Sequence, residues 1–205
     1  VEIVRGGKTP VAYILVTAGS GNRTIIYERN SLHRIDVDER LKNLTARSDI
    51  VLLDPEVTYL VKPLKAAAKG RIKIVYDCER WREGIEEVMH SADYFIPSSV
   101  FLDSDRLNFG DIAFIRKIAK LNEMVAGQLI VTRGEKGAYY PIGKKLYRVA
   151  VPATKAVDTI GAGDVFNAAM IRALGRRETL QQALVSAVSL ATATCGREGL
   201  TILAG

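Results

Sequence analysis

The chain has 205 residues, of which 48% are hydrophobic and 25% charged, the composition of an ordinary globular protein with one substantial core. The formal net charge is +6, but Lys and Arg are spread along the sequence, which disfavours nucleic acid as a partner and favours small anions. No apolar run is long enough to span a membrane. Cys78 and Cys195 lie too far apart to form a zinc or redox motif. We therefore expect a cytoplasmic protein without membrane contact.

The first part of the chain has the pattern of a β-hairpin. Two strand-like runs, "PVAYILVT" at residues 10–17 and "RTIIYER" at residues 23–29, are joined by the Gly-rich segment "AGSGN". From residue 31 onward, short apolar runs alternate with segments of helical periodicity. Buried strands are predicted at residues 49–54, 72–77, 94–97 and 128–134, and helices within residues 58–70, 82–92 and 111–126.

Continuously apolar strands that alternate with helices predict a parallel sheet with helices on both faces. The runs "AYYPI" and "LYRVAVP" then predict an antiparallel pair with a turn at "GKK". Two final helices are predicted at residues 163–174 and 179–194. In such sheets ligands bind outside the carboxyl ends of the strands, so Asp54, Asp77, Glu79, Gly134 and the loop at Gly161 are expected at one edge.

The segment "KAVDTIGAGDVFNAAM", residues 155–170, carries the main chemical signal. Gly161, Ala162 and Gly163 precede a predicted helix, where consecutive backbone N–H groups suit a transferring phosphoryl group. Asp164 could accept the proton of an alcohol that attacks the phosphorus. In the alternative interpretation, Asp158 or Asp164 only caps the helix and the glycines only shape a turn.

Residues 158–164, "DTIGAGD", match every fixed position of the pattern D-T-x-G-A-G-D of the ribokinase-like (PfkB) carbohydrate kinases, which the sequence resembles along nearly its whole length. Further matches are "GNRTIIY", "VYDCER", "VTRGEKGA" and "ATCGREG", and two of these segments are most similar to the ketohexokinase-like branch. The resemblance implies a three-layer α/β/α fold with a mostly parallel central sheet and a small β lid. Residues 1–30 would form part of the lid and residues 31–205 the nucleotide-binding and catalytic core, effectively one domain.

The resemblance also implies an activity. A member of this family would be an ATP-dependent sugar kinase that uses Mg²⁺ and, in many cases, K⁺, and that forms a homodimer through the β lid. A fructose-like acceptor is favoured, while adenosine and ketodeoxygluconate kinases of the same family remain alternatives. A non-catalytic scaffold protein is the alternative from another functional class, although such a protein would not need Asp164.

The family's site residues can be assigned to matching positions of this sequence. Asp164 matches the catalytic base, which also contacts the sugar, and Gly161, Ala162 and Gly163 match the anion hole. The positions implied to contact ATP are Arg23, Gly134, Glu135, Lys136, Gly137, Cys195 and Gly196. The positions implied to hold the monovalent cation through their carbonyl groups are Asp158, Ile160, Arg197 and Gly199.

Several of these positions have ordinary structural alternatives. Arg23 follows a turn and could be a solvated strand residue, and "TRGEKG" could be only a polar turn. Asp77 and Glu79 match acidic positions near magnesium or substrate in the family, but solvated acids at strand ends are equally expected.

The sequence departs from the family pattern at two places. The usual first strand with a sugar-contacting Asp, and the G-G-N-type segment after it, are not found, and the N-x-x-E motif is replaced by "VFLDSD" after "YFIPSS". We therefore expect the N-terminal strands of the family domain to be missing from this chain, with the nucleotide half present. A reduced, non-catalytic relative is the competing explanation.

Overall fold

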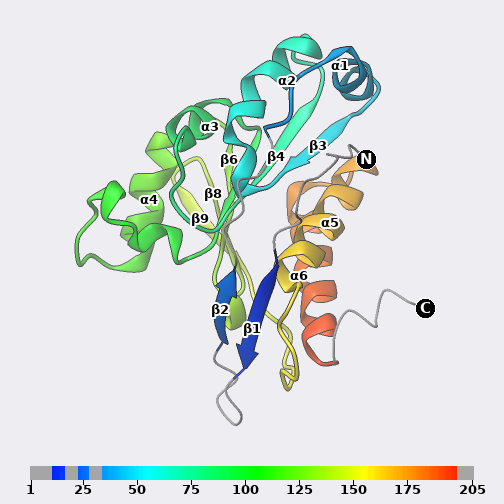
Figure 1. Ribbon diagram of the computed structural model, residues 1–205. Coiled ribbons are helices and arrows are strands. Elements are labelled where there is room, and N and C mark those ends of the chain that lie inside the picture. The colour runs from blue at the N-terminus through cyan, green and yellow to red at the C-terminus, as the bar shows by residue number, and fades with distance from the viewer. Residues whose placement is uncertain (1–10, 17–22, 28–33, 198–205) are drawn as a thin grey trace. The chain divides into compact units, whose positions relative to one another are not determined.

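The computed structural model describes residues 11–16, 23–27 and 34–197 (Figure 1). The chain divides into two compact units, Val1–Asp36 and Val37–Gly205. In the first unit, strands β1 (Ala12–Val16) and β2 (Arg23–Tyr27) pair antiparallel in a two-stranded sheet of their own. The two predicted hairpin strands are confirmed, whereas the predicted turn between them lies outside the described residues.

The second unit contains a four-stranded sheet in which all strands are parallel. Its strands, in spatial order, are β3 (Ile50–Leu53), β4 (Lys73–Cys78), β5 (Tyr94–Pro97) and β6 (Gln128–Leu129). The predicted parallel direction of the four strands is therefore confirmed, and so is the position of the first three. Strand β3 is the edge of this sheet, and its Leu52 side chain is 44% exposed.

The last predicted strand differs from the prediction, because residues 128–134 do not form one continuous strand. Ile130 interrupts the strand and separates β6 from β7 (Val131–Thr132). The chain still follows β5 beyond the interruption, since Ile130 donates its N–H to the carbonyl of Phe95 at 3.0 Å and Thr132 forms a parallel bridge with Ser98. On its other side, β7 pairs antiparallel with β8 (Ala138–Ile142). Strand β8 pairs in turn with β9 (Lys145–Val149), which confirms the predicted antiparallel pair.

The helices follow the predicted order, with one addition. Their bounds are α1 (Glu39–Ala46), α2 (Val61–Ala67), α3 (Ile85–Ser91), α4 (Phe114–Met124), α5 (Ala162–Gly175) and α6 (Leu180–Cys195). Short 3₁₀ turns are η1 (Pro55–Leu60), η2 (Phe101–Asp103), η3 (Asp105–Leu107) and η4 (Gly134–Lys136). Helix α1 was not predicted; Asp38 caps it by accepting the N–H of Leu41 at 2.8 Å. Pro63 lies in the first turn of α2, where a proline is tolerated.

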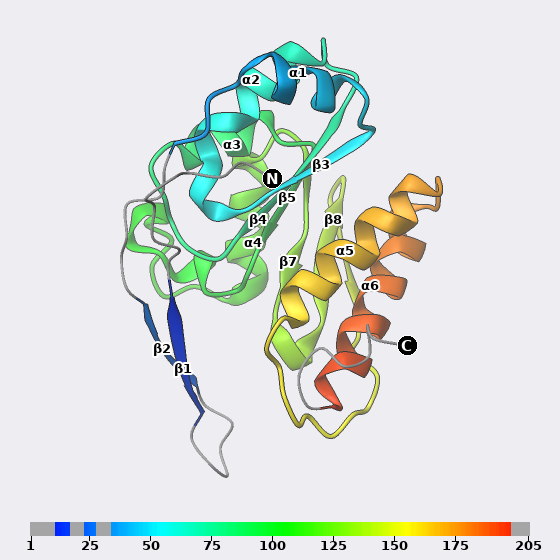
Figure 2. The same ribbon diagram turned by 45° about the vertical axis from the view of Figure 1, so that its right-hand side comes forward.

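Two apolar cores lie on opposite faces of the parallel sheet. Along β4, Ile74 and Tyr76 belong to a core that includes residues of α2, α3 and α4, whereas Val75 between them belongs to a core with α5 and α6. Alternate side chains of a strand point to opposite faces, so both faces of the sheet are covered. Figures 1 and 2 show α5 and α6 side by side on one face. The predicted three-layer α/β/α arrangement is confirmed.

Within the described part of the chain, no helix has the length and apolar character needed to cross a membrane.

Candidate active site

The N-terminus of α5 is shaped by glycine backbone and not by a capping side chain. Gly161 is the N-cap residue, its φ of 73° lies in the left-handed region, and no side chain accepts a hydrogen bond at this cap. Asp158 accepts the N–H of Ile160 at 2.8 Å, one turn before the helix, and Asp164 lies inside the first turn. Neither aspartate is therefore the N-cap residue of α5, which is Gly161.

The first turn of α5 offers backbone N–H groups at an open surface. The first N–H groups of a helix have no partner inside the helix, and the helix dipole makes this end attractive to anions. A Cβ atom built on Gly163 would meet no other atom within 4 Å. Because no other described residue fills that space, a ligand can approach the backbone of the predicted anion hole closely.

Two carboxylates meet at the carboxyl end of β4. Burial, the largest cause, and the charge of Asp164 raise the pKa of Asp77 from its ordinary 3.8 to about 6. Hydrogen bonds from the Cys78 backbone and the Asn167 side chain act in the opposite direction. Asp77 is half-buried and Asp164 is exposed. The fold thus brings together two of the acids predicted at this edge of the sheet, one from β4 and one from α5.

Asn167 is a site residue that the sequence reasoning missed. It follows Asp164 by three residues, which places both on the same side of α5, and it is only 2% exposed. Its side chain bonds to Asp77, while its Oδ1 atom has no hydrogen-bond partner in the described part of the structure. The available signal was a polar residue inside the apolar run "VFNAAM", where a buried amide needs partners.

The oxygen atoms gathered here are of the type that Mg²⁺ binds. Mg²⁺ usually takes one or two carboxylates and completes its shell with water and phosphate oxygens. The carboxylates of Asp77 and Asp164 and the unpartnered amide oxygen of Asn167 fit that pattern. Among the described residues, no three or more His, Cys, Asp or Glu side chains are grouped as metal ligands.

The predicted nucleotide loop, residues 134–137, is a tight turn that follows β7. Gly137 donates its N–H to Gly134 at 2.9 Å, and Lys136 donates to the carbonyl of Arg133 at the same distance. Gly137 has a φ of 86°, and a Cβ atom on it would lie 2.0 Å from the carbonyl oxygen of Val149. Only glycine fits that position. Glu135 and Lys136 are exposed.

The segment at the end of α6 is tied to the loop that precedes Gly161. The carbonyl of Cys195 accepts the N–H groups of Val157 and Asp158 at 2.7 and 3.2 Å. These two bonds use both lone pairs of that oxygen, so Cys195 serves to position the loop. Gly196 caps the end of α6, and Arg197 donates its N–H to Thr194 at 3.2 Å. Gly199 and the side chain of Arg23 lie outside the described residues.

The other acids predicted at the sheet edge have structural roles. Asp54 caps η1 by accepting the N–H of Glu56 at 2.9 Å. Glu79 is exposed, and its carboxylate lies 3.9 Å from the guanidinium of Arg80. Glu79 is therefore better explained as a solvated acid at the end of a strand than as a residue of the site.

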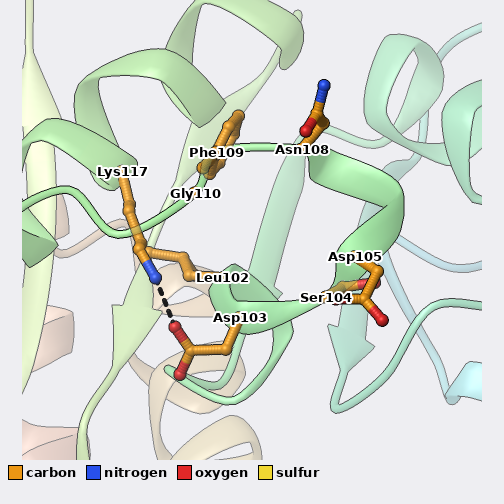
Figure 3. Close-up of a pocket in the computed structure, with 8 residues that line it drawn as sticks. All are labelled: Leu102, Asp103, Ser104, Asp105, Asn108, Phe109, Gly110 and Lys117. Atoms are coloured by element: carbon orange, nitrogen blue, oxygen red, sulfur yellow. Dashed lines mark hydrogen bonds and ion pairs between the residues drawn. The ribbon is translucent and has the colours of Figure 1, made fainter.

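A cavity of about 330 Å³ lies elsewhere on the second unit (Figure 3). In Figure 3 the side chains of Asp103 and Lys117 point toward each other, and their ion pair measures 2.6 Å. None of the residues predicted to form the active site lines this cavity.

Comparison with known proteins independently bears on the family to which the chain belongs. Residues 1–204 match the family model described as pfkB family carbohydrate kinase. The chain is 27% identical to mouse ketohexokinase over 207 residues, a match that covers 94% of this chain and 68% of that protein. It is 25% identical to an ATP-dependent 6-phosphofructokinase from Thermoanaerobacterium thermosaccharolyticum, with 90% of this chain and 62% of that protein covered.

Solved structures show the same fold. A ribokinase from Thermotoga maritima matches with a TM-score of 0.76 at 25% identity over 95% of this chain and 65% of that one. A ribokinase from Arabidopsis thaliana, solved with ribose and ATP, matches with a TM-score of 0.72 at 23% identity over 92% of this chain and 63% of that one. The chain thus spans about two thirds of these relatives. Because the family model covers almost every residue, the chain belongs to the pfkB family of carbohydrate kinases.

Proposed function

We propose that this protein is an ATP-dependent sugar kinase in which Asp164 accepts the proton of the attacking sugar hydroxyl. The observation that carries the proposal is the position of Asp164, in the first turn of a helix that begins at an uncapped Gly161 and faces the second carboxylate, Asp77. A positioned base beside backbone N–H groups can activate an alcohol and stabilise the charge on a transferring phosphoryl group.

The other residues of the site have distinct roles in this mechanism. The N–H groups of Gly161 and Gly163 bind phosphate oxygens, while that of Ala162 donates to the carbonyl of Thr159 at 3.4 Å. The 134–137 loop contacts the nucleotide, and a contact of Arg23 with its phosphates remains a prediction. Asp77 and Asn167 would hold Mg²⁺, which would neutralise charge on the ATP phosphates. A K⁺ ion at the carbonyls of Asp158, Ile160, Arg197 and Gly199 remains a prediction. The relatives support ATP and Mg²⁺, since one ribokinase-like structure from E. coli was solved with both.

A fructose-like acceptor is the favoured substrate because mouse ketohexokinase is among the matched relatives. Ribokinase from Lactococcus lactis and 2-dehydro-3-deoxygluconokinase from Haemophilus influenzae also match, so these acceptors belong in the same test. A scaffold protein is disfavoured, since it has no need of an open glycine backbone beside an exposed aspartate.

The hairpin and the edge of the sheet supply two further proposals. Tyr13 and Ile26 face each other across β1 and β2 and are 64% and 54% exposed, which suits an apolar contact with the hairpin of a second copy. Among the described residues, β3 pairs with β4 alone, and its exposed Leu52 and unpaired edge suit pairing with further strands of the family domain.

The test uses a chain completed with the N-terminal strands of the family domain. In this chain, sugar-dependent ADP release is measured in the presence of Mg²⁺ and ATP for fructose, ribose, adenosine and ketodeoxygluconate. Asp164→Asn should lower kcat by about 10²- to 10⁴-fold with little change in the KM for ATP. Asp111→Asn, which removes an exposed carboxylate elsewhere, is the matched control. A parent protein without sugar-dependent turnover, or an Asp164→Asn variant with parental turnover, contradicts the proposal.

A further inference from the structure

Four side chains beside the 134–137 loop form a row with a cationic group at each end and two aromatic rings between them. The guanidinium of Arg133 lies 3.9 Å from the ring centroid of Phe114. The Phe114 ring packs edge-on against Tyr139, with 5.2 Å between centroids and an interplanar angle of 78°. The guanidinium of Arg148 lies 5.6 Å from the ring of Tyr139. We call Arg133, Phe114, Tyr139 and Arg148 the cation–aromatic ladder.

Both ends of this ladder are bonded to the loop. Arg133 directly precedes the loop, and its N–H donates to the carbonyl of Gly137 at 2.8 Å. Arg148 donates from Nε to the carbonyl of Lys136, also at 2.8 Å. The members of the ladder come from the end of β7, the start of α4, β8 and β9, so the ladder connects the loop to three other elements.

The loop is held on one side and open on the other. Gly137 packs against the carbonyl of Val149 so closely that no side chain fits, whereas a Cβ atom on Gly134 would meet nothing within 4 Å. The exposed side of the loop is therefore accessible to a ligand, while the ladder and β9 restrain its inner side.

We propose that the cation–aromatic ladder holds the 134–137 loop in the conformation that receives the nucleotide, so that Arg148 and Tyr139 are positioning residues for nucleotide binding. The inference rests on the proposed kinase function, since it requires the loop to contact ATP. A planar guanidinium can stack on Tyr139 and donate from Nε at the same time, which a lysine ammonium cannot do equally well.

The experiment combines amide hydrogen exchange of the loop with ADP binding measured by calorimetry in the presence of Mg²⁺. In Arg148→Met, the Lys136 and Gly137 amides should exchange faster and ADP affinity should fall by about 5- to 10-fold, the size expected for one hydrogen bond and one exposed cation–π contact. Arg148→Lys should be intermediate. Tyr139→Phe, which keeps the ring, should match the parent, whereas Tyr139→Leu should resemble Arg148→Met. Lys145→Met, on the same strand, is the control for loss of a positive charge.

Each outcome bears on a different part of the proposal. Unchanged loop exchange in Arg148→Met and Tyr139→Leu overturns the role of the ladder. Faster exchange with parental ADP affinity overturns its role in nucleotide binding and leaves a structural one. If the parent binds no ADP while the loop responds to Arg148→Met, the kinase proposal fails, and the nucleotide role of the ladder fails with it.

Discussion

Asp77 and Asp164 interact electrostatically across two elements, the end of β4 and the first turn of α5. Asp77 is the more buried of the two, and its pKa therefore rises to about 6. A carboxyl group with a raised pKa beside an exposed carboxylate is typical of functional sites. Ionisation of such a group lowers the stability of the folded state.

The first prediction concerns the pH dependence of stability. The folded pKa of Asp77, about 6, lies above its ordinary value of 3.8, so the native state binds the extra proton between these pH values. Stability from this group is therefore fully present below pH 3.8 and lost as the pH rises through 6. Asp77→Asn should be more stable than the parent at pH 7.5, by about 2 to 3 kcal/mol as an upper bound. Urea unfolding at pH 4 and pH 7.5 measures this, and an equal difference at both pH values contradicts it.

The second prediction concerns Asn167 as the hydrogen-bond donor to Asp77. This bond lowers the pKa of Asp77 by favouring the ionised form, so Asn167→Ala should raise that pKa further. The titration of the Asp77 carboxyl group, followed by carbon NMR, should move to higher pH, while Asn122→Ala on α4 should leave it unchanged. A titration that moves to lower pH would show that the bond does not favour the carboxylate.

The sequence predicts the central sheet well because its strands contain short apolar runs. β3 is the run Ile50–Leu53 and β4 contains Ile74, Val75 and Tyr76, and such runs are recognisable without knowledge of their partners. Helix α1 was missed because Thr45 is its one buried residue, which leaves little apolar periodicity to detect. The interruption at Ile130 was also missed, because it depends on how this strand pairs with β5 and β8 and leaves no local pattern.

In the candidate site, too, some features could be predicted from the sequence and others could not. The loop at residues 158–164 is a local motif, and its glycine N-cap could be predicted from the sequence alone. The approach of Asp77 to Asp164 depends on how α5 packs against the sheet through Phe166 and Met170, which lie in one core with Val75. The sequence could place Asp77 at the right edge, but it could not distinguish Asp77 from Glu79, which the structure leaves exposed.

The third prediction compares two glycines of the 134–137 loop. Gly137→Ala should destabilise the protein strongly, by about 3 kcal/mol or more, because the new Cβ would overlap the Val149 carbonyl. Gly134→Ala adds a Cβ in open space and should cost only about 1 kcal/mol, for its left-handed backbone with a φ of 47°. Thermal unfolding of the two variants measures the difference. Equal melting temperatures contradict the packing of Gly137 against β9.

The last prediction separates stability from function at Gly163. This glycine lies in the first turn of α5, and a Cβ atom there would meet no other atom of the described residues within 4 Å. Alanine favours helix over glycine, so Gly163→Ala should leave the stability unchanged or raise it by about 0.5 to 1 kcal/mol.

If the first turn of α5 binds the phosphoryl group, the added methyl group occupies the space through which phosphate oxygens reach the backbone. Gly163→Ala should then lower kcat or ATP affinity by about tenfold or more, although the fold is at least as stable. Gly175→Ala, which also adds a Cβ in open space at the other end of α5, is the matched control. Melting temperature and sugar-dependent ADP release are measured on the same preparations. A Gly163→Ala variant with parental kinetics would remove the N-terminus of α5 from the phosphate site.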